Sequence, residues 1–558
     1  MTLTYYGNQQ VSKQLFYEQL VDNPPPVIAI DTETISLKEK LPIGFSIATS
    51  PNEAWWFDSY PERDAEIEML GALLSNPNII KVFANVMFDI RIMPLIFTEF
   101  VYDESNIADV LVWARLLGHT NARVTDLAST IGREVQPAEE LLIEYGTKTM
   151  IELPREAVSS HCATDAKATL ALYHHFLPQM SGLGLSPDYL DVERKVVPIL
   201  VDMSLRGLKI DQEARAAMEK KMEEDRDYYS NFCASYDFKP GSGMQAGYIL
   251  AKRGNFLPFT KSGKQYKTDE ETLELIDDPL AAVVLGYKRA NSILTKYLYP
   301  LRNLDRIYTE YGLDTEVGRT KSSNFNMQNI PAKSSRIGID VRHIFLPDND
   351  VFTSGDFSQL HLRFLMHMSD DTEMKRVYYD GKDGGDIHVS TMKKIHKPRS
   401  ISKIVNYAIP YGGDAHTLAK QMKTKNLRWC SDLIDDWFNA YPEAAQWLRD
   451  ARKYAVNNGK SLPTLFNRQI AIPEEFNKWG KLDIKAMERK GANYPILGSD
   501  GEVMKRALII CSNRELPLAV QIHDSITLDG DCTFPIEALE SLAPVATPFE
   551  VDKSERWK

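Results

Sequence analysis

The chain has 558 residues, of which 43% are hydrophobic, and its 65 lysines and arginines against 77 aspartates and glutamates give a net charge of −12. At about 100–200 residues per domain, this length predicts several folding units and excludes a single small domain. The acidic total argues against nonspecific coating of a polyanion, because attraction to phosphates scales with cation density, but it leaves room for a local basic cleft.

The sequence shows no signal for membrane insertion, secretion, disulfide bonding or zinc binding. No run of about 18 or more apolar residues occurs, and the first residues lack the basic and apolar regions of a secretory signal. The 5 cysteines are far apart in the sequence and form no Cys-x-x-Cys pair, so neither a disulfide framework nor a zinc site is predicted. We therefore expect a reducing, cytoplasmic compartment and no membrane contact.

The first predicted strand covers residues 27–30, a short apolar run after three prolines, and it leads into Asp31-Thr32-Glu33. Residues i and i+2 of a strand point the same way, so Asp31 and Glu33 would share one face. Two unpaired anions there are costly, and a divalent cation such as Mg²⁺, which binds carboxylates together with water and phosphate oxygens, removes that cost. Solvated acids at the end of a strand are the alternative for this triplet alone.

The pattern after this strand predicts one α/β domain that ends near residue 180. A second apolar run at 79–83 predicts another strand, and helical patterns follow at 105–118 and 155–178. The segment 181–187 is rich in helix breakers and is the predicted linker.

Further acids extend the first pair of carboxylates. They are Asp89, Asp109 and Asp165. With Asp31 and Glu33 they make this domain resemble the 3′→5′ exonuclease fold of the DEDD group. The resemblance implies that four of these acids, all except Asp109, bind two metal ions, one that generates hydroxide and one that stabilises the leaving 3′ oxygen. We expect Asp109 to be a structural neighbour.

His161 stands four positions before Asp165, where the proofreading domains of DNA polymerase I-like enzymes usually have Tyr. The histidine subclass usually has four residues between these positions, whereas this chain has Cys162-Ala163-Thr164. An imidazole is suited to orienting or deprotonating the attacking water, and we interpret His161 as that residue. A packing or surface histidine is the alternative.

Beyond the linker, residues 188–230 predict a long exposed helix that is broken at Arg206-Gly207. A strand near 351–355 then delivers Asp356, and an amphipathic helix follows at 359–368. Far downstream, two apolar runs flank His523-Asp524-Ser525 in a hairpin pattern. Asp356 and Asp524 can meet only through the fold.

A helix predicted to begin after Pro398 carries the third constellation. Arg399, Lys403 and Tyr407 lie on one of its faces, and Pro410 is predicted to end or kink it. Two cations and an aromatic ring suit a triphosphate with a stacked sugar and base. A solvated basic face with a core tyrosine is the alternative for this helix taken alone.

These stretches resemble the three polymerase motifs of family A DNA polymerases, which match residues 356–363, 399–412 and 521–525. Supporting matches follow in the family's order, at 315–319, 326–331, Arg342, 386–388, 441–442, 464–466, 488–489 and Asn493. The resemblance covers nearly the whole chain. It implies a multidomain α/β and α+β protein, in which a ribonuclease H-like exonuclease domain precedes a right-hand polymerase domain with palm, fingers and thumb.

The resemblance also implies a division of the chain. We expect an exonuclease domain at 1–186, the thumb and polymerase entry at 187–310, the palm at 311–372 and 488–558, and the fingers at 373–487.

The implied activity is template-directed extension of a primer by dNTPs, with proofreading, in DNA replication. Asp356 and Asp524 would bind two Mg²⁺ ions, or Mn²⁺ in their place, and the exonuclease site would bind two more. The residues expected to bind the nucleotide are Arg399, Lys403, Tyr407, His388, His361 and Gln359. Those expected to bind the primer-template are Arg342, Gln328, Asn329, Tyr411, Arg489, Asn493 and His523. Contacts to the backbone and minor groove suit an enzyme that accepts every sequence.

Several positions depart from the family pattern. His361 stands where a Glu usually crowds the sugar 2′ position, and we hypothesise that the imidazole still excludes ribonucleotides, though less tightly. Ser525 replaces a common Glu, Leu497 replaces a Gln in a segment that is shortened before Asp500, and Asn467 stands where a Gly-Arg pair is usual. Both palm aspartates remain, so metal chemistry is expected to survive.

Two other functions stay open at this point. One is a nuclease for RNA or DNA ends whose C-terminal part is a degenerate nucleic-acid clamp, and the other is a noncatalytic scaffold that binds primer-template for another protein. The retained palm aspartates and the basic helix disfavour both. Because only 30 residues precede Asp31, we expect no 5′ nuclease domain and favour a compact, monomeric, phage-type replicative polymerase in a bacterial or phage-infected cell, with accessory replication proteins as further partners.

Overall fold

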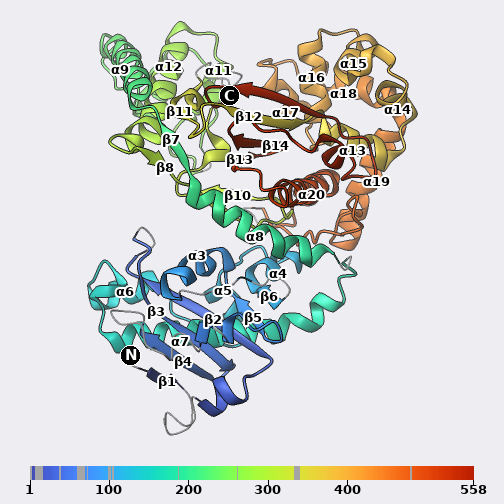
Figure 1. The fold of residues 1–558 in the computed structure, drawn as a ribbon. Coiled ribbons are helices and arrows are strands. Elements are labelled where there is room, and N and C mark those ends of the chain that lie inside the picture. The colour runs from blue at the N-terminus through green and yellow to red at the C-terminus, as the bar shows by residue number, and fades with distance from the viewer. Residues whose placement is uncertain are drawn as a thin grey trace.

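The computed structural model describes residues 3–6, 17–36, 39–58, 70–71, 73–97, 102, 106–185, 188–260, 262–331, 340–477 and 480–558. Within these ranges no helix combines the length and the apolar character needed to cross a membrane. The N-terminal part lies at the bottom of Figure 1 and the C-terminal part above it. The predicted linker crosses residues 186 and 187, which lie outside the described ranges, so the expected boundary at 186 is not described.

The N-terminal domain is built on a six-stranded sheet with strand order β1-β4-β3-β2-β5-β6. The strands are β1 (Leu3–Tyr6), β2 (Val27–Thr34), β3 (Pro42–Ser50), β4 (Glu53–Asp58), β5 (Ile80–Phe83) and β6 (Ile107–Asp109). β2 pairs antiparallel with β3 and parallel with β5. Its apolar start is buried on both faces, as predicted, but the strand continues to Thr34, so Asp31 and Glu33 lie inside the strand and not after its end.

The N-terminal domain also contains helices, of which the first and the last α-helix pack directly against the sheet (Figure 1). They are α3 (Val86–Ile96), α4 (Val110–Leu116), α5 (Val124–Thr130), α6 (Ala138–Tyr145) and α7 (Arg155–Ser181), with short helical turns η1 (Tyr17–Asp22) and η3 (Met150–Glu152). The helix predicted at 155–178 is confirmed. The pattern at 105–118 is only partly helical, because β6 comes first and the Asp109 carboxylate, by accepting hydrogen bonds from the N–H groups of Leu111 and Val112, starts α4.

The prediction of a long exposed helix over 188–230 is confirmed in its break at Arg206-Gly207 and in the exposure of the helix after it, and it is wrong for the helix before the break, which is buried. The stretch contains α8 (Tyr189–Arg206), the short strand β7 (Leu208–Ile210) and α9 (Gln212–Ala234), with Gly207 at a positive φ of 58° between helix and strand. Val196 and Leu200 of α8 are fully buried, because this helix packs on α3 below it and on α20 (Ile484–Ser512) above it (Figure 1). Charged side chains such as Glu193 are therefore buried ion-pair partners and not a solvated face.

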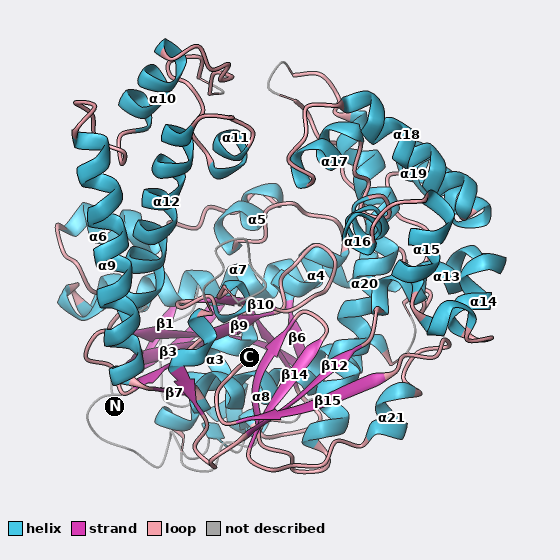
Figure 2. Cartoon of the chain, turned by 90° about the horizontal axis from the view of Figure 1, so that it is seen from above, coloured by secondary structure: helices cyan, strands magenta, loops and turns pink. Residues whose placement is uncertain are grey.

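A helical arm follows α8. α9 packs along α12 (Pro279–Ile293), and α10 (Gly243–Lys252) and α11 (Glu270–Glu274) lie near their upper end in Figure 2. The arm continues through η4 (Leu294–Leu298) and η5 (Tyr299–Leu301) into small sheets. These contain β8 (Arg306–Ile307), β9 (Glu310–Gly312), β10 (Lys321–Ser323) and β11 (Phe345–Leu346), with η6 (Met327–Asn329) and η7 (Val341–Ile344) between them.

A four-stranded antiparallel sheet with order β13-β14-β12-β15 lies between the arm and a group of helices (Figure 2). Its strands are β12 (Phe352–Phe357), β13 (Leu518–Ile522), β14 (Ser525–Asp529) and β15 (Phe549–Ser554). The predicted strand before Asp356 and the predicted hairpin around Asp524 are both confirmed. β15 was not predicted, and it pairs with β12 along its whole length.

The helical group carries the remaining predicted helices. It contains α13 (Leu360–Ser369), α14 (Thr372–Tyr378), η8 (Lys382–Gly385), α15 (Ile387–Ile395), α16 (Arg399–Ala408), α17 (Ala415–Gln421), α18 (Leu427–Ala440) and α19 (Pro442–Asn458), and α21 (Ile536–Glu540) lies before β15. The helix after Pro398 is confirmed and ends at Ala408, two residues before Pro410.

Candidate active sites

The five residues predicted for the exonuclease site come together at β2, α3 and α7. They are Asp31, Glu33, Asp89, His161 and Asp165. Asp31 and Glu33 share one face of β2, as their spacing predicts. Nε2 of His161 lies 3.6 Å from Oε1 of Glu33 and 4.0 Å from Oδ2 of Asp165, so the histidine side chain, which is 8% exposed, joins the strand carboxylates to the helix carboxylate.

Burial and mutual repulsion favour the protonated forms of these acids. Burial, reinforced by the charge of Asp89, raises the pKa of Asp31 to about 8, and burial raises that of Asp89 to about 8 as well. The pKa values of Glu33 and Asp165 are also raised, first by burial and then by the charge of Asp31. Oδ1 of Asp165 is buried without a hydrogen-bond partner. Acids that are costly to ionise and offer an unpaired oxygen fit a divalent cation.

Burial also lowers the pKa of His161, against the opposing charge of Glu139. The imidazole is therefore neutral near pH 7, and a neutral ring can accept a proton from water.

Cys162 is a member of this site that sequence reasoning missed. Its Sγ donates to Oδ2 of Asp31 over 3.2 Å and to the carbonyl of the same residue over 3.3 Å. Ligand atoms of Asp31, Glu33 and Cys162 all lie within 4.8 Å of one another. Burial raises the pKa of the thiol, so Cys162 stays a donor that orients Asp31. Its position three residues before Asp165 on the same helix, which puts both side chains on one face, is the signal that could have identified it.

Asp109 lies beside the site, and its carboxylate binds backbone N–H groups. Its carboxylate accepts hydrogen bonds from the backbone N–H groups of Val86 at 2.9 Å and of Leu111 at 2.8 Å. It thereby joins the starts of α3 and α4, and the expectation of a structural role is confirmed.

The palm aspartates lie side by side at the ends of β12 and β14. Asp356 faces Ser525 across the two strands, and the N–H of Phe357 donates to the carbonyl of Asp524 over 3.1 Å. Burial, with the charges of Asp524 and Glu550, raises the pKa of Asp356 to about 7. The pKa of Asp524 is raised by burial and by the charge of Asp500. This second acid pair likewise fits a divalent cation.

Glu550 is a neighbour of Asp356 that sequence reasoning missed. Asp356 lies opposite Ser525 on β14 and opposite Glu550 on β15, and opposite residues of antiparallel strands point to one face. The Ser525 hydroxyl donates to the carbonyl of Ile522 over 2.9 Å. Glu550 is exposed and supplies a carboxylate on the face where Ser525 has none. It was missed because the strand that carries it was not predicted.

The predicted face of α16 with two cations and an aromatic ring is present. Nη2 of Arg399 donates to Oδ2 of Asp386 over 2.7 Å, Lys403 is exposed, and the ring of Tyr407 lies 5.5 Å from that of His388. Two cations and two rings thus line one side of the helical group. The pKa of Tyr407 is raised by burial and then by the charge of Asp524, which places this helix in the field of the palm aspartates.

His388 differs from a surface cation. It is 3% exposed, and its Nδ1 lies 2.9 Å from Nδ2 of Asn406. Burial lowers its pKa to about 4, so the ring is neutral near pH 7. It can offer a hydrogen bond to a phosphate but no charge.

The start of α13 carries Gln359 and His361. Gln359 adopts a positive φ of 55° before the helix, and its Oε1 accepts a hydrogen bond of 2.9 Å from the hydroxyl of Tyr378. Nδ1 of His361 contacts the hydroxyl of Tyr411, and Nε2 lies 3.1 Å from Nη2 of Arg319. Tyr411, expected to bind the primer-template, therefore contacts His361, which is expected to bind the nucleotide.

The residues predicted for the primer-template occupy the remaining rim of the palm. Nε2 of Gln328 donates to Oε1 of the buried Gln521 over 3.1 Å, which fixes its amide, and Asn329 is exposed beside it. Arg342 lies 5.1 Å above the ring of Trp557. His523 is exposed at the hairpin turn, with a φ of 49°.

Arg489 and Asn493 face the same region from α20. Arg489 is exposed, and its Cβ lies 3.2 Å from where a side chain at Gly412 would begin, so only glycine, at a φ of +77°, allows the helical group to approach α20 there. Asn493 is half-buried and its Oδ1 has no hydrogen-bond partner, which leaves an acceptor available.

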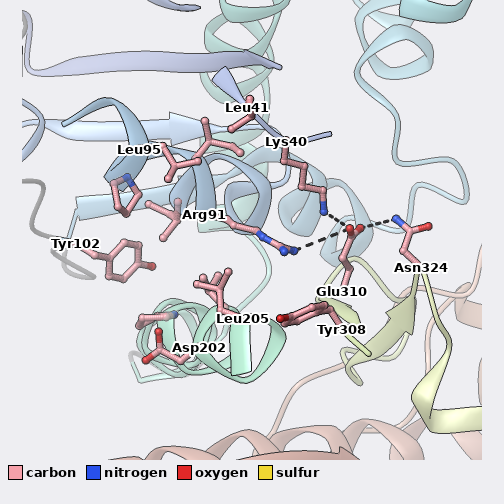
Figure 3. A pocket seen from close by; sticks show the side chains of 15 residues that line it. Lys40, Leu41, Arg91, Leu95, Tyr102, Asp202, Leu205, Tyr308, Glu310 and Asn324 are labelled. Carbon is pink, nitrogen blue, oxygen red and sulfur yellow. Dashed lines mark hydrogen bonds and ion pairs between the residues drawn. The ribbon is translucent and has the colours of Figure 1, made fainter. Parts of the chain in front are cut away.

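A cavity of about 990 Å³ lies between the exonuclease domain and the segments that carry α8 and β9 (Figure 3). At one end Glu310 of β9 pairs with Lys40, lies 4.0 Å from Arg91 of α3, and accepts a hydrogen bond of 2.7 Å from Asn324. This cluster connects the two halves of the chain at the cavity. None of the five predicted exonuclease residues lines it.

Comparisons with known proteins agree with this architecture. Residues 209–541 match the family described as DNA polymerase family A, and residues 9–181 match 3'-5' exonuclease. DNA polymerase I of Pseudomonas aeruginosa is 26% identical over 93% of this chain, and that of Caldicellulosiruptor bescii is 30% identical over 61% of it. The chain spans 61% and 43% of the length of these two relatives.

A solved structure shows the same fold. It is described as the POL domain of Pol1 from M. smegmatis in complex with DNA primer-template and dNTP, and it matches with a TM-score of 0.77 at 19% identity over 95% of both chains. The expected exonuclease-then-polymerase fold class is confirmed. Because the polymerase family matches residues 209–541, more than half of the 558 residues, the chain belongs to DNA polymerase family A and carries a 3'-5' exonuclease domain before its polymerase domain.

Proposed function

We propose that this chain is a template-directed DNA polymerase that extends primer 3′ ends with dNTPs and excises terminal nucleotides at a separate 3′→5′ exonuclease site. The observation that carries the proposal is the presence of two carboxylate clusters on two different sheets. One cluster is on β2, α3 and α7, and the other is Asp356 with Asp524 on the palm sheet. DNA replication as the process, a monomeric state, accessory proteins and a cytoplasmic location stay predictions.

At the palm, Asp356 and Asp524 would hold divalent cations, for which we propose Mg²⁺. When bound, such ions favour ionisation of the primer 3′ hydroxyl and neutralise the departing pyrophosphate. Arg399 and Lys403 attract the triphosphate, Arg399 exchanging Asp386 for a phosphate oxygen. Tyr407 supports the sugar and base, and His388 donates a hydrogen bond.

At the exonuclease site, the same class of ion would be held by Asp31, Glu33, Asp89 and Asp165. His161 orients the attacking water beside Glu33 and Asp165, and Cys162 holds the carboxylate of Asp31 in place. The raised pKa values support cation binding, because a bound cation relieves the repulsion that favours the protonated acids.

The remaining residues would bind the primer-template duplex, and the polymerase domain has three proposed parts. Gln328, Asn329, Arg342 and His523 would contact the primer-template, with Arg489 and Asn493 on α20. The arm of α9 to α12 fits the thumb, the four-stranded sheet fits the palm, and the helices α14 to α19 fit the fingers. These assignments follow the expected boundaries at 187–310, 311–372, 373–487 and 488–558.

The test is extension of a labelled primer on a DNA template with Mg²⁺, with and without dNTPs. Asp356→Ala should lose extension by at least about a thousandfold and keep shortening, because only one cluster is removed. Asp31→Ala should show the reverse. Each variant is the control for the folding of the other.

Two outcomes would contradict the proposal. Shortening without extension in the wild type would leave a nuclease with a nucleic-acid clamp. Binding of primer-template without either reaction would leave a scaffold.

A further inference from the structure

A chain of four polar side chains runs from the interior of α20 to the end of α16. Oδ2 of Asp500 accepts a hydrogen bond from Nε of Arg319 and forms an ion pair with Nη2 of the same side chain. Nη2 of Arg319 lies 3.1 Å from Nε2 of His361, and Nδ1 of that ring contacts the hydroxyl of Tyr411. Asp500 is 1% exposed, so its charge is buried at the inner end of the chain.

These contacts assign a tautomer to His361. A guanidinium group only donates hydrogen bonds, so Nε2 must accept and the ring proton lies on Nδ1. That proton is donated to the oxygen of Tyr411. The hydroxyl proton of Tyr411 then points away from the ring and is available to a ligand.

Asp500 is the anchor of this arrangement. Burial favours its protonated form, but the charge of Arg319 outweighs burial and holds the pKa of Asp500 below its usual value, and Nε2 of His361 lies 3.6 Å from Oδ2 of Asp500. Arg319 also interacts with the charge of Asp524, a palm aspartate. Without the charge of Asp500, the guanidinium group of Arg319 would move towards Asp524 and lose its contact with His361.

We propose that Asp500 is a positioning residue for nucleotide sugar selection, which acts by holding Arg319 against Nε2 of His361 so that His361 and Tyr411 present one fixed surface to the incoming nucleotide. The inference rests on the proposed polymerase function. His361 follows Asp356 on the helix that begins after β12, so its ring lies beside the proposed nucleotide site. In this chain the carboxylate near the sugar 2′ position comes from Asp500 on α20, because position 361 carries a histidine.

The first experiment compares kcat/KM for a deoxynucleotide with that for the matching ribonucleotide. Asp500→Asn keeps the shape of the side chain and removes its charge, and it should lower the deoxy-to-ribo ratio by about tenfold, the effect of one lost charge-assisted hydrogen bond. In a His361→Ala background the same substitution should have no further effect, because its route to the sugar is gone.

Glu502→Gln is the matched control. Glu502 lies on the same helix, is 2% exposed, and its Oε1 accepts a hydrogen bond of 2.8 Å from Nε of Arg468, so both variants remove a buried charge from α20. The control should leave the ratio within about twofold of the wild type, since it does not contact His361. Equal changes in both variants, or no change in Asp500→Asn, would overturn the proposal.

A rescue variant separates positioning from general damage. His361→Glu combined with Asp500→Ala moves the carboxylate to α13 beside Arg319, and the ratio should return towards the wild-type value. Failure to recover, with normal deoxynucleotide extension, counts against a positioning role.

A second measurement does not depend on polymerase activity. Nitrogen-15 NMR of histidine-labelled protein should show His361, identified by loss of its signal in His361→Gln, as the Nδ1-protonated tautomer in the wild type and not in Asp500→Asn. An Nε2-protonated ring in the wild type would overturn the inference even if primers are extended. If no primer is extended but the tautomer is as stated, the proposed function fails while the positioning contact stands.

Discussion

Single residues of the exonuclease site lower the stability of the metal-free protein. In the unfolded chain Asp89 ionises near pH 4, whereas in the folded chain its pKa is about 8. Between these values the folded state binds more protons than the unfolded state, so the free energy of unfolding falls as pH rises from about 4 to about 8. A bound divalent cation removes this dependence by favouring the ionised form.

Asp89→Asn should therefore stabilise the metal-free protein. Thr32 donates to Oδ1 of Asp89 from its hydroxyl at 2.7 Å and from its N–H at 3.2 Å, and an amide oxygen can accept both bonds. We expect the midpoint of thermal unfolding of this domain, measured with a chelator at pH 8, to rise by about 5 °C, and to rise much less at pH 5.

The exposed residue Asp126 provides the control. Its carboxylate pairs with Arg123 at the surface, so Asp126→Asn should leave the midpoint unchanged at both pH values. Added Mg²⁺ should raise the midpoint of the wild type at pH 8. An unchanged or lower midpoint for metal-free Asp89→Asn would show that ionisation of the buried carboxylate does not destabilise the fold.

At the scale of elements, the pairing of α8 with α20 holds the two halves of the chain together. Lys505 of α20 is fully buried and pairs with Glu193 of α8, which is 6% exposed. A buried pair gains little over an apolar contact, but removal of one partner leaves an uncompensated buried charge.

Lys505→Met should accordingly cost about 3 kcal/mol of unfolding free energy, and the double variant Lys505→Met with Glu193→Leu should recover most of it. The measurement is the urea midpoint of the transition that unfolds these helices. Asp188→Asn is the control from the same helix pair, because Asp188 meets Arg506 at an exposed position and should cost less than about 1 kcal/mol. A double variant as unstable as the single one would refute the pairing.

At the scale of the whole molecule, the thumb and the fingers meet above the palm. Lys420 of α17 pairs with Glu271 of α11 at 2.5 Å, and Lys423 pairs with Glu274 at 2.9 Å. The two arms therefore form a closed ring over the proposed duplex site. Both lysines are exposed and Glu271 is half-buried, so the contact should weaken as salt rises.

Lys420→Glu should open this ring, because it places two like charges together. We expect about a threefold drop in the number of nucleotides added per binding event at low salt, as one exposed ion pair is replaced by repulsion. High salt should bring the wild type down to the level of the variant. Glu271→Lys added to Lys420→Glu should restore the wild-type value, and a double variant that stays low would instead indicate that Lys420 contacts DNA.

Many helices and strands of the fold can be predicted from local sequence patterns. The apolar run before Asp31, the proline boundaries of α16 and the hairpin around Asp524 depend on neighbouring residues, because alternation, turn residues and helix starts act over a few positions. The shared face of Asp31 and Glu33 followed from the strand period, whereas the full set of exonuclease acids came from the resemblance to the DEDD group.

What the sequence by itself determined is therefore the type of the elements with a strong local pattern and the identity of the acidic and basic groups that the proposed reactions need. The tertiary structure alone decided which faces meet: it buried α8, set Glu550 opposite Asp356, placed Cys162 against Asp31 and joined Asp500 to His361 through Arg319. These contacts link residues far apart in the chain, and no local period records which distant surface will cover a given side chain. The physical reason is that burial and charge pairing depend on the packed whole, whereas propensity depends only on neighbours.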